Sequence, residues 1–349
     1  MKLKKISKLF KVFFVFIFGI LFFIIFSTAI ISSIISRSIG KYPSYLIETV
    51  YNSVRSDTYK SKDKINFLVL GLDERNDALE KTTTTDTIIF ASLNLKTFKL
   101  NLISTPRDLW FYEKGVKINN LYPLSLESGQ NKFDFLKTNF ETLYGQPIDH
   151  IVIITTQNLI SFVNIIGGVD VYLNKGFTDD QYPNQAYIDN PSPEIPIYKT
   201  ISFPAGWNHL DSSNITEFVR SRKSAETSAE GGTDIGRIQR QQLLIDALLN
   251  KIKSGNLASN TAQLKNLYFF WDKNISKTLS DSDALQIVLV LKKNLLNISL
   301  NKIEIPIGTN SIDGVIYHPE KLKVTKQWVF ITNDDKYQAF HQFIKNSLN

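Results

Sequence analysis

The chain has 349 residues, of which 43% are hydrophobic, and this length accommodates one large or two modest folded units. Its formal net charge is +7, but residues 1–41 hold seven of the 40 basic residues and none of the 33 acidic ones. The remainder is balanced at 33 basic against 33 acidic residues, which argues against a nucleic-acid-binding surface. The lack of cysteine excludes disulfides, thiol nucleophiles and cysteine-based metal sites.

The N-terminal residues predict a membrane anchor. Residues 1–11 contain five lysines, and residues 12–35 form an uncharged apolar run of 24 residues. As a helix this run reaches about 36 Å, enough to cross a hydrocarbon core of about 30 Å. A cleaved signal peptide is the alternative, but its apolar region usually spans only about 7–15 residues. The lysines place the N-terminus in the cytoplasm and the chain beyond about residue 41 outside the cell membrane.

The next segments predict a stalk followed by a sheet. Residues 36–62 mix polar and apolar side chains without strand periodicity, so we expect them to form a stalk. Apolar and β-branched runs then predict three strands, with a short hairpin over residues 95–97 joining the last two. These strands are expected at residues 65–71, 86–94 and 98–104.

Helices and strands alternate farther along the chain. Helical spacing closed by glycine predicts helices at residues 133–145 and 157–168, with strands at residues 150–156 and 169–173. Further helices are expected at residues 211–222, 234–253, 283–296 and 334–348, around a strand at residues 301–307. This alternation, with near-continuous apolar strands, favours an α/β fold in which helices cover both faces of a sheet.

A cluster of four arginines lies in residues 218–242, around a Gly-Gly pair. A helix beginning at Thr233 or Asp234 would bury a stripe of isoleucines and leucine and place three polar side chains on an adjacent face. The stripe is Ile238, Ile245, Leu249 and Ile252, and the polar side chains are Arg237, Arg240 and Gln241. Backbone N–H groups at a helix N-terminus and arginine guanidiniums both suit a phosphate or pyrophosphate.

Two further arginines of this cluster precede the glycines. Arg220 and Arg222 are two residues apart, so in an extended segment they would face the same side and close over the same anion. The alternative is a solvent-exposed face on which the arginines pair with Glu226, Glu230 and Asp234.

Acidic residues occur at the ends of two predicted strands. Asp73 and Arg75 follow the first strand, and Asp86 begins the second. Ligand sites in such sheets lie where strand ends meet loops, and two carboxylates there would suit Mg²⁺. The alternative is that Asp73 is a turn residue and Asp86 a strand-start residue. Arg107 and Asp108 follow a third strand.

Other catalytic motifs are missing from the sequence. It contains no G-x-S-x-G elbow, no P-loop lysine motif and no H-E-x-x-H, and its four histidines are scattered. These observations argue against a serine hydrolase, a nucleoside triphosphatase and a zinc enzyme.

The order of six motifs over about residues 65–253 resembles the LytR-CpsA-Psr family. The motifs are "FLVLGLDER", "TDTIIFASLNLKTFKLNLISTPRDLWF", "KINNLY", "IDHIVIITTQNLISFVNIIGGVDVYL", "AGWNHLD" and "FVRSR…TDIGRIQRQQ". The resemblance implies a membrane-anchored, extracytoplasmic phosphotransferase with an α-β-α sandwich domain. It would move a glycopolymer, such as teichoic acid or capsule, from a polyprenyl-pyrophosphate carrier to peptidoglycan through a phosphodiester. On this basis residues 63–349 form the catalytic domain, with the motif core at 65–253 completed by 256–349.

The resemblance also assigns site residues. Asp73 and Asp86 would serve Mg²⁺, with Mn²⁺ as a substitute, and Asp73, Asp86 and Arg107 are the catalytic candidates. Pyrophosphate oxygens would be bound by Arg107, Arg220, Arg222, Arg237, Arg240 and Gln241. The family also carries the polyprenyl chain in a hydrophobic tunnel between sheet and helices.

Two departures from the family pattern affect these expectations. Thr84-Thr85-Asp86-Thr87 stands where the family often has Arg-Ser-Asp-Thr, which removes one basic group, and Arg75 is the candidate replacement. The stretch "LDSSNITEF" also differs from the usual Leu-Asp-Gly-x-x-Ala-Leu.

Three functions are compatible with the motifs. The first is the glycopolymer transferase, the second a polyprenyl-pyrophosphate hydrolase in which water replaces the sugar hydroxyl, and the third a non-catalytic lipid-pyrophosphate-binding regulator of the envelope. The presence of both Asp73 and Asp86 favours catalysis over binding alone. The glycopolymer, the acceptor sugar, the proton acceptor and the oligomeric state are left open by the sequence.

Overall fold

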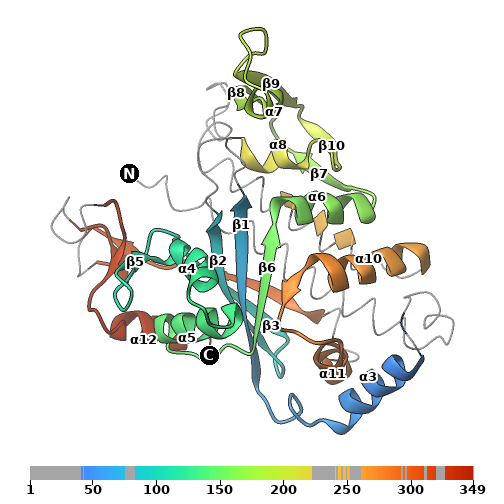
Figure 1. Cartoon of the computed structure of the whole chain (residues 1–349), viewed down its shortest axis with the longest axis vertical. Coiled ribbons are helices and arrows are strands. Elements are labelled where there is room, and N and C mark those ends of the chain that lie inside the picture. Colours follow the sequence, from blue (N-terminus) through green and yellow to red (C-terminus); the bar gives the residue numbers. More distant parts are fainter. Residues whose placement is uncertain are drawn as a thin grey trace.

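A computed structural model of the chain shows a central sheet between two layers of helices (Figure 1). It describes residues 41, 43–74, 83–221, 261–291, 294, 297–309, 313–319 and 327–348, and positions 240, 243, 244, 247, 248, 250 and 251. The predicted anchor at residues 12–35 lies outside these residues. Within the described part of the chain, no helix combines the length and apolar character needed to span a bilayer.

The central sheet has six strands in the order β11-β6-β1-β2-β3-β12. Its strands are β1 (Lys64–Glu74), β2 (Thr83–Asn94), β3 (Lys99–Thr105), β6 (His150–Thr155), β11 (Ser276–Lys277) and β12 (Ser299–Ile303). The first three are consecutive and antiparallel, whereas β6 is parallel to β1 and β12 is parallel to β3. The sheet is therefore mixed, and the three strands predicted at residues 65–104 are confirmed.

Alternating side chains of the central strands supply two hydrophobic cores. Val69 and Ile89 belong to the core beneath α6 (Thr156–Ile165), α8 (Ile215–Arg220), α10 (Thr261–Asn274) and α11 (Asp281–Leu291). Leu68 and Phe90 belong to the opposite core, beneath α4 (Leu121–Glu127), α5 (Lys132–Tyr144) and α12 (Gln338–Ser347). A strand buried on both faces needs an apolar residue at nearly every position, which explains the continuous apolar runs in the sequence. The predicted sandwich is confirmed.

Several small elements surround the sandwich. Strands β4 (Trp110–Phe111) and β5 (Val116–Lys117) form one hairpin, followed by the short helix η1 (Ile118–Asn120). Strands β13 (Ile307–Gly308), β14 (Ile316–Tyr317) and β15 (Ile331–Thr332) form a three-stranded sheet. Strands β8 (Phe177–Pro183) and β9 (Tyr198–Phe203) flank the helix α7 (Gln185–Asp189). The strand predicted at 169–173 is β7 (Val169–Leu173), but it pairs with β10 (Gly206–Leu210) outside the central sheet.

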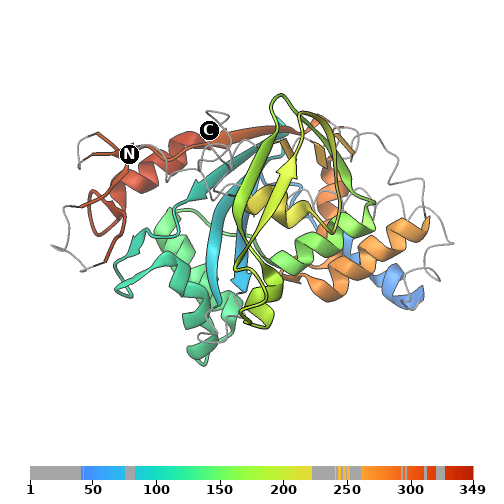
Figure 2. The same ribbon diagram turned by 90° about the horizontal axis from the view of Figure 1, so that it is seen from above.

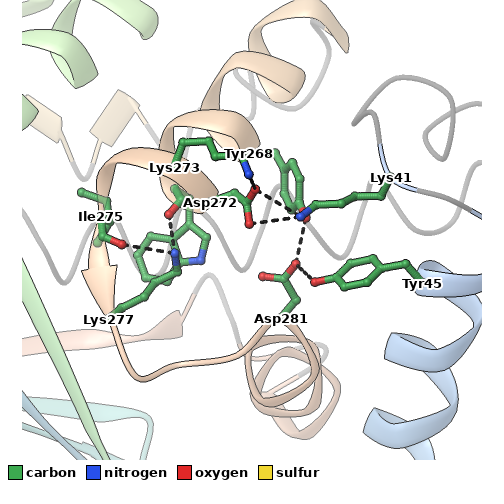
Figure 3. Close-up of polar contacts among 9 residues, drawn as sticks. Lys41, Tyr45, Tyr268, Asp272, Lys273, Ile275, Lys277 and Asp281 are labelled. Atoms are coloured by element: carbon green, nitrogen blue, oxygen red, sulfur yellow. Dashed lines mark hydrogen bonds and ion pairs between the residues drawn. The ribbon is translucent and has the colours of Figure 1, made fainter. Parts of the chain in front are cut away.

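The second half of the predicted stalk is packed onto the domain. Residues Pro43–Arg55 form helix α3, which packs against α11. The Lys41 ammonium lies 3.1 Å from Asp272 Oδ2, and the Tyr45 hydroxyl donates to Asp281 Oδ2 over 2.6 Å (Figure 3). Tyr268 donates to the same oxygen of Asp281 over 2.9 Å. The expectation of a stalk is therefore corrected for residues 43–62. Tyr45 and Ser53 bond to partners more than 200 residues away, and Tyr59 bonds to His150.

Candidate functional site

A β-bulge brings the two candidate metal-binding aspartates to one end of the sheet. Gly71 pairs with Thr87 and Leu72 pairs with Thr85, so Asp86 is an extra residue on β2. Asp73 lies one pair farther along β1, opposite Thr84. Bulges redirect a side chain and are common beside active sites. The backbones of both aspartates thus lie on neighbouring strands near the carboxyl-terminal end of β1, whereas their side chains lie outside the described part of the structure.

Three neutral oxygen atoms near this end of the sheet are buried without a hydrogen-bond partner among the described residues. They are Thr87 Oγ1 beside the bulge, Ser104 Oγ on β3 and Asn119 Oδ1 at the end of η1. A buried polar atom left without a partner costs about 1–3 kcal/mol, so each of these oxygens suits a bound water or a polar ligand. The sequence analysis did not select these residues, although all three lie inside quoted motifs.

Two hydrogen bonds connect Arg107 to the bulge through Asn119. The Asn119 N–H donates to the carbonyl of Arg107 over 3.2 Å, and the Thr85 hydroxyl donates to the carbonyl of Asn119 over 3.2 Å. The Arg107 side chain is half-buried, with its Nε 3.6 Å from Asp108 Oδ2. Lys117 approaches the other oxygen of Asp108 at 3.0 Å. The structure therefore brings Arg107 next to the strand that carries Asp86.

Arg220 is the last residue of α8, and it is exposed. Its positive charge acts on Tyr182, where burial raises the pKa of the phenol and Arg220 opposes that rise. Glu217, one helical turn earlier, is engaged by Lys199 at 2.6 Å. Ser221 is extended and buried, so the helix ends at Arg220.

Arg240 occupies a buried position that the sequence analysis did not expect. Its Nε donates to the carbonyl of Phe218 over 3.0 Å, and one terminal nitrogen donates to the carbonyl of Ser221 over 2.7 Å. Its guanidinium carbon lies 4.1 Å from the centre of the Phe177 ring. Carbonyls at the end of a helix need donors, and Arg240 supplies them from another segment of the chain.

This burial corrects the predicted faces of the helix over residues 234–253. Arg240 is only 3% exposed and lies four and eight residues before the buried Leu244 and Leu248. It therefore shares their buried stripe, rather than the adjacent polar face that helical spacing predicted. By fixing the end of α8, Arg240 positions Arg220 and the start of the segment that follows.

The remaining predicted site residues are not described by the structure. Arg75, Arg222, Arg237 and Gln241 lie outside the described residues, so their roles stay predictions. Within the described part, no group of three or more His, Cys, Asp and Glu side chains is arranged to hold a metal ion. Figures 1 and 2 show α8 near the carboxyl-terminal end of β1, so Arg220 and the bulge lie at the same end of the domain.

The same chain matches a known protein family. A model of the LytR_cpsA_psr family matches residues 37–330. The chain belongs to the LytR_cpsA_psr family. The match includes α3, which agrees with the packing of that helix onto the domain.

Members of the LytR_cpsA_psr family with similar sequences include two proteins named polyisoprenyl-teichoic acid–peptidoglycan teichoic acid transferase TagU. The one from Oceanobacillus iheyensis is 27% identical over 263 residues, covering 74% of this chain and 72% of the relative. The one from Enterococcus faecalis is 25% identical over 345 residues, covering 97% and 98%. The solved structure of "TagT bound to LIIa-WTA" has the same fold, with a TM-score of 0.51, 21% identity and coverage of 85% and 95%.

Proposed function

We propose that this protein is a phosphotransferase that moves a glycopolymer from a polyprenyl-pyrophosphate carrier to peptidoglycan through a phosphodiester bond. The membership of the LytR_cpsA_psr family and the names of the TagU relatives support this reaction. The observation that carries the proposal is the bulge that sets Asp86 on the strand beside Asp73, at the end of the domain where Arg220 lies. Acidic and basic residues thus come from the same end of the domain, where a metal-bound pyrophosphate would need both.

The proposal includes Mg²⁺, or Mn²⁺, at Asp73 and Asp86. The unpartnered oxygens of Thr87, Ser104 and Asn119 fit this assignment, because Mg²⁺ prefers oxygen ligands and retains several waters that need acceptors. When bound, the ion would neutralise charge on the pyrophosphate.

The arginines would bind the remaining phosphate oxygens. Arg107 and Arg220 come from different elements, and Arg222, Arg237 and Gln241 are the candidates from the segment after α8. A sugar hydroxyl of the wall would attack the phosphorus that carries the glycopolymer. The new O–P bond would form as the bond to the bridging oxygen breaks, polyprenyl phosphate would leave, and the hydroxyl would lose its proton. Such a reaction depends mainly on positioning and charge neutralisation, so arginines and a metal are sufficient.

We further propose that residues 12–35 anchor the protein in the cell membrane with the catalytic domain outside. The lysine-rich residues 1–11 and the uncharged apolar run support this orientation. Because the folded domain already begins at about Lys41, only five residues, 36–40, would separate it from the membrane. This arrangement would keep the site near a lipid-borne donor.

The proposal is tested with the full-length protein in nanodiscs, a polyprenyl-pyrophosphate-linked oligosaccharide, Mg²⁺ and peptidoglycan fragments. Mass spectrometry should show a phosphodiester-linked conjugate. Asp86→Asn should lower the rate at least about 100-fold, and EDTA should abolish turnover. Asp57→Asn is the matched control, because Asp57 is an exposed partner of Lys60. Sugar phosphate without a conjugate would indicate the hydrolase, and bound donor without turnover would indicate the binding module.

A further inference from the structure

The β7–β10 ribbon presents one face to solvent. Val169, Val171 and Leu173 of β7 point into the core, whereas the intervening residues are exposed. On β10 the exposed positions again alternate with buried ones. The exposed residues in the middle of the two strands form what we call the ribbon face, which consists of Asp170, Tyr172, Trp207 and His209.

Two aromatic side chains dominate the ribbon face. Tyr172 and Trp207 are direct partners across the two strands, and their ring centroids are 5.4 Å apart in an edge-to-face arrangement. Trp207 is 73% exposed, the highest value among the large hydrophobic side chains that the structure shows as exposed, and Tyr172 is 49% exposed. A pair of this kind leaves a large apolar surface in water, which marks a binding surface more often than an isolated exposed side chain does.

A polar pair lies next to the aromatic pair. Asp170 and His209 are also direct partners across the strands, and His209 Nδ1 is 2.7 Å from Asp170 Oδ1. The imidazole also lies against Gly168, where an added Cβ would be 2.3 Å from His209 Nε2. Gly168 has a φ of +72° and leaves room for the ring. The carboxylate and the imidazole are therefore already joined to each other at the surface of the ribbon.

We propose that the ribbon face binds the glycan strand of the acceptor, a neutral, hydroxyl-rich polysaccharide backbone. This inference rests on the proposed function. Aromatic side chains combine an apolar surface with little conformational freedom, which suits the C–H faces of pyranose rings. A neighbouring carboxylate and imidazole supply acceptors and donors for sugar hydroxyls.

The chemistry of the ribbon face favours a sugar over a lipid surface. None of its four residues is lysine or arginine, the side chains that anionic headgroups attract. The neighbouring Lys251 donates to the carbonyls of Gly167 and Gly168, so its ammonium is already engaged by the protein. Placing the Asp170 carboxylate in the apolar part of a bilayer would also carry a large desolvation cost. A hydroxyl-rich polymer requires neither basic residues nor burial of that charge.

The ribbon is joined closely to the candidate site. β10 leads through residues 211–214 directly into α8, which ends at Arg220. The Asn214 side chain donates to the carbonyl of His209 over 3.0 Å and accepts from the Asp211 N–H over 3.0 Å. Figures 1 and 2 both show the ribbon beside α8, near the carboxyl-terminal end of β1. A glycan on the ribbon face would thus lie at the same end of the domain as the aspartates.

The test uses full-length protein in nanodiscs with a fixed donor and glycan fragments of peptidoglycan as acceptor. Trp207→Ala should raise the KM for the acceptor by about tenfold and leave the kcat and the donor KM unchanged, because one aromatic contact is lost. Trp207→Phe should restore part of the affinity. Tyr51→Ala, which removes a 54% exposed tyrosine on α3, is the control and should change neither KM.

An unchanged acceptor KM in Trp207→Ala would overturn the inference. A second measurement compares the quenching of tryptophan fluorescence by brominated lipids in the wild type and in Trp207→Phe. Quenching that is lost in Trp207→Phe would show that the ribbon contacts the bilayer, and this would also overturn the inference. If the wild type forms no conjugate, the proposed function fails. Calorimetric titration with the same glycan fragments then decides the inference alone: weaker binding by Trp207→Ala supports it, and equal binding refutes it.

Discussion

Arg240 Nε donates to the carbonyl of Phe218 over 3.0 Å, which joins the segment after the Gly-Gly pair to the end of α8. The same guanidinium donates to the carbonyl of Ser221 and stacks on Phe177. These contacts are buried, so they contribute to the stability of the domain as well as to the position of Arg220.

Arg240→Ala should therefore destabilise the protein, by about 2–4 kcal/mol, because two buried carbonyls lose their donor. Arg220→Ala should change stability by less than about 0.5 kcal/mol, since that side chain is exposed. Urea unfolding in detergent measures both, and donor turnover should fall in both. An Arg240→Ala protein as stable as the wild type that has lost donor binding would instead assign Arg240 to the ligand.

The contrast between these two arginines shows where sequence reasoning is limited. Helical spacing places Arg240 on a defined face relative to its neighbours, but it does not reveal which face the fold buries. The burial depends on α8, about 20 residues earlier, whose terminal carbonyls need donors. Such a requirement becomes visible only when both segments are placed in space.

The strands illustrate the opposite case. β1, β2 and β3 were predicted because their β-branched and apolar runs both favour the extended conformation and suit a strand buried on its two faces. β7 was also predicted as a strand, but its partner β10 lies over 30 residues away, so its place outside the central sheet could not be deduced. The helix α10 was not predicted, although Leu264, Leu267, Tyr268 and Trp271 follow helical spacing and are buried.

The sequence predicted only part of the candidate site, because local pattern locates the ends of strands but not the register between them. Asp73 and Asp86 were placed at neighbouring strand ends from local pattern, and their backbones do lie on adjacent strands. The bulge at Asp86 depends on the register between β1 and β2, which the sequence does not display. The unpartnered oxygens of Thr87 and Asn119 depend on burial, which is likewise a property of the complete fold.

Thr87→Val should lower turnover by about 10-fold or more without loss of stability. The substitution keeps the shape of the side chain and removes a buried hydroxyl that has no partner among the described residues, so stability should stay equal or rise. Ser92→Ala is the matched control, because Ser92 Oγ is also buried and unpartnered on β2 but lies six residues from Asp86. Equal turnover in Thr87→Val and wild type would remove Thr87 from the site.

Asp281→Ala should loosen the attachment of α3. The Asp281 carboxylate accepts from Tyr45 over 2.6 Å and from Tyr268 over 2.9 Å, and both hydroxyls would lose this acceptor. We expect a loss of about 2–3 kcal/mol and faster amide exchange in α3 than in α5. Asp57→Ala, which breaks the exposed pair with Lys60, should cost less than about 1 kcal/mol. Unchanged exchange in α3 of Asp281→Ala would show that other contacts hold this helix.

Stability should decrease as the pH falls from about 6.5 towards 4. Burial lowers the pKa of His150 from 6.5 to about 4, although Asp283 and Asp149 oppose the shift. Its Nε2 lies 2.5 Å from the Tyr59 hydroxyl inside the core. Between these pKa values the unfolded chain binds a proton that the folded protein does not. The free energy of unfolding therefore falls with decreasing pH, by up to about 1.4 kcal/mol per pH unit. The contribution of the neutral His150 to stability is complete above pH 6.5 and is lost below about pH 4.

His150→Gln is the variant that isolates this contribution, because glutamine retains hydrogen-bonding groups near Tyr59 but does not titrate. Urea unfolding in detergent at several pH values should show a shallower dependence for His150→Gln than for the wild type between pH 6.5 and 4. His341→Gln is the control, since that half-buried ring lies outside the core and bonds to the carbonyl of Thr142, and its profile should follow the wild type. If His150→Gln and the wild type have parallel profiles, other groups cause the loss of stability in acid, and the buried imidazole is not the group that titrates.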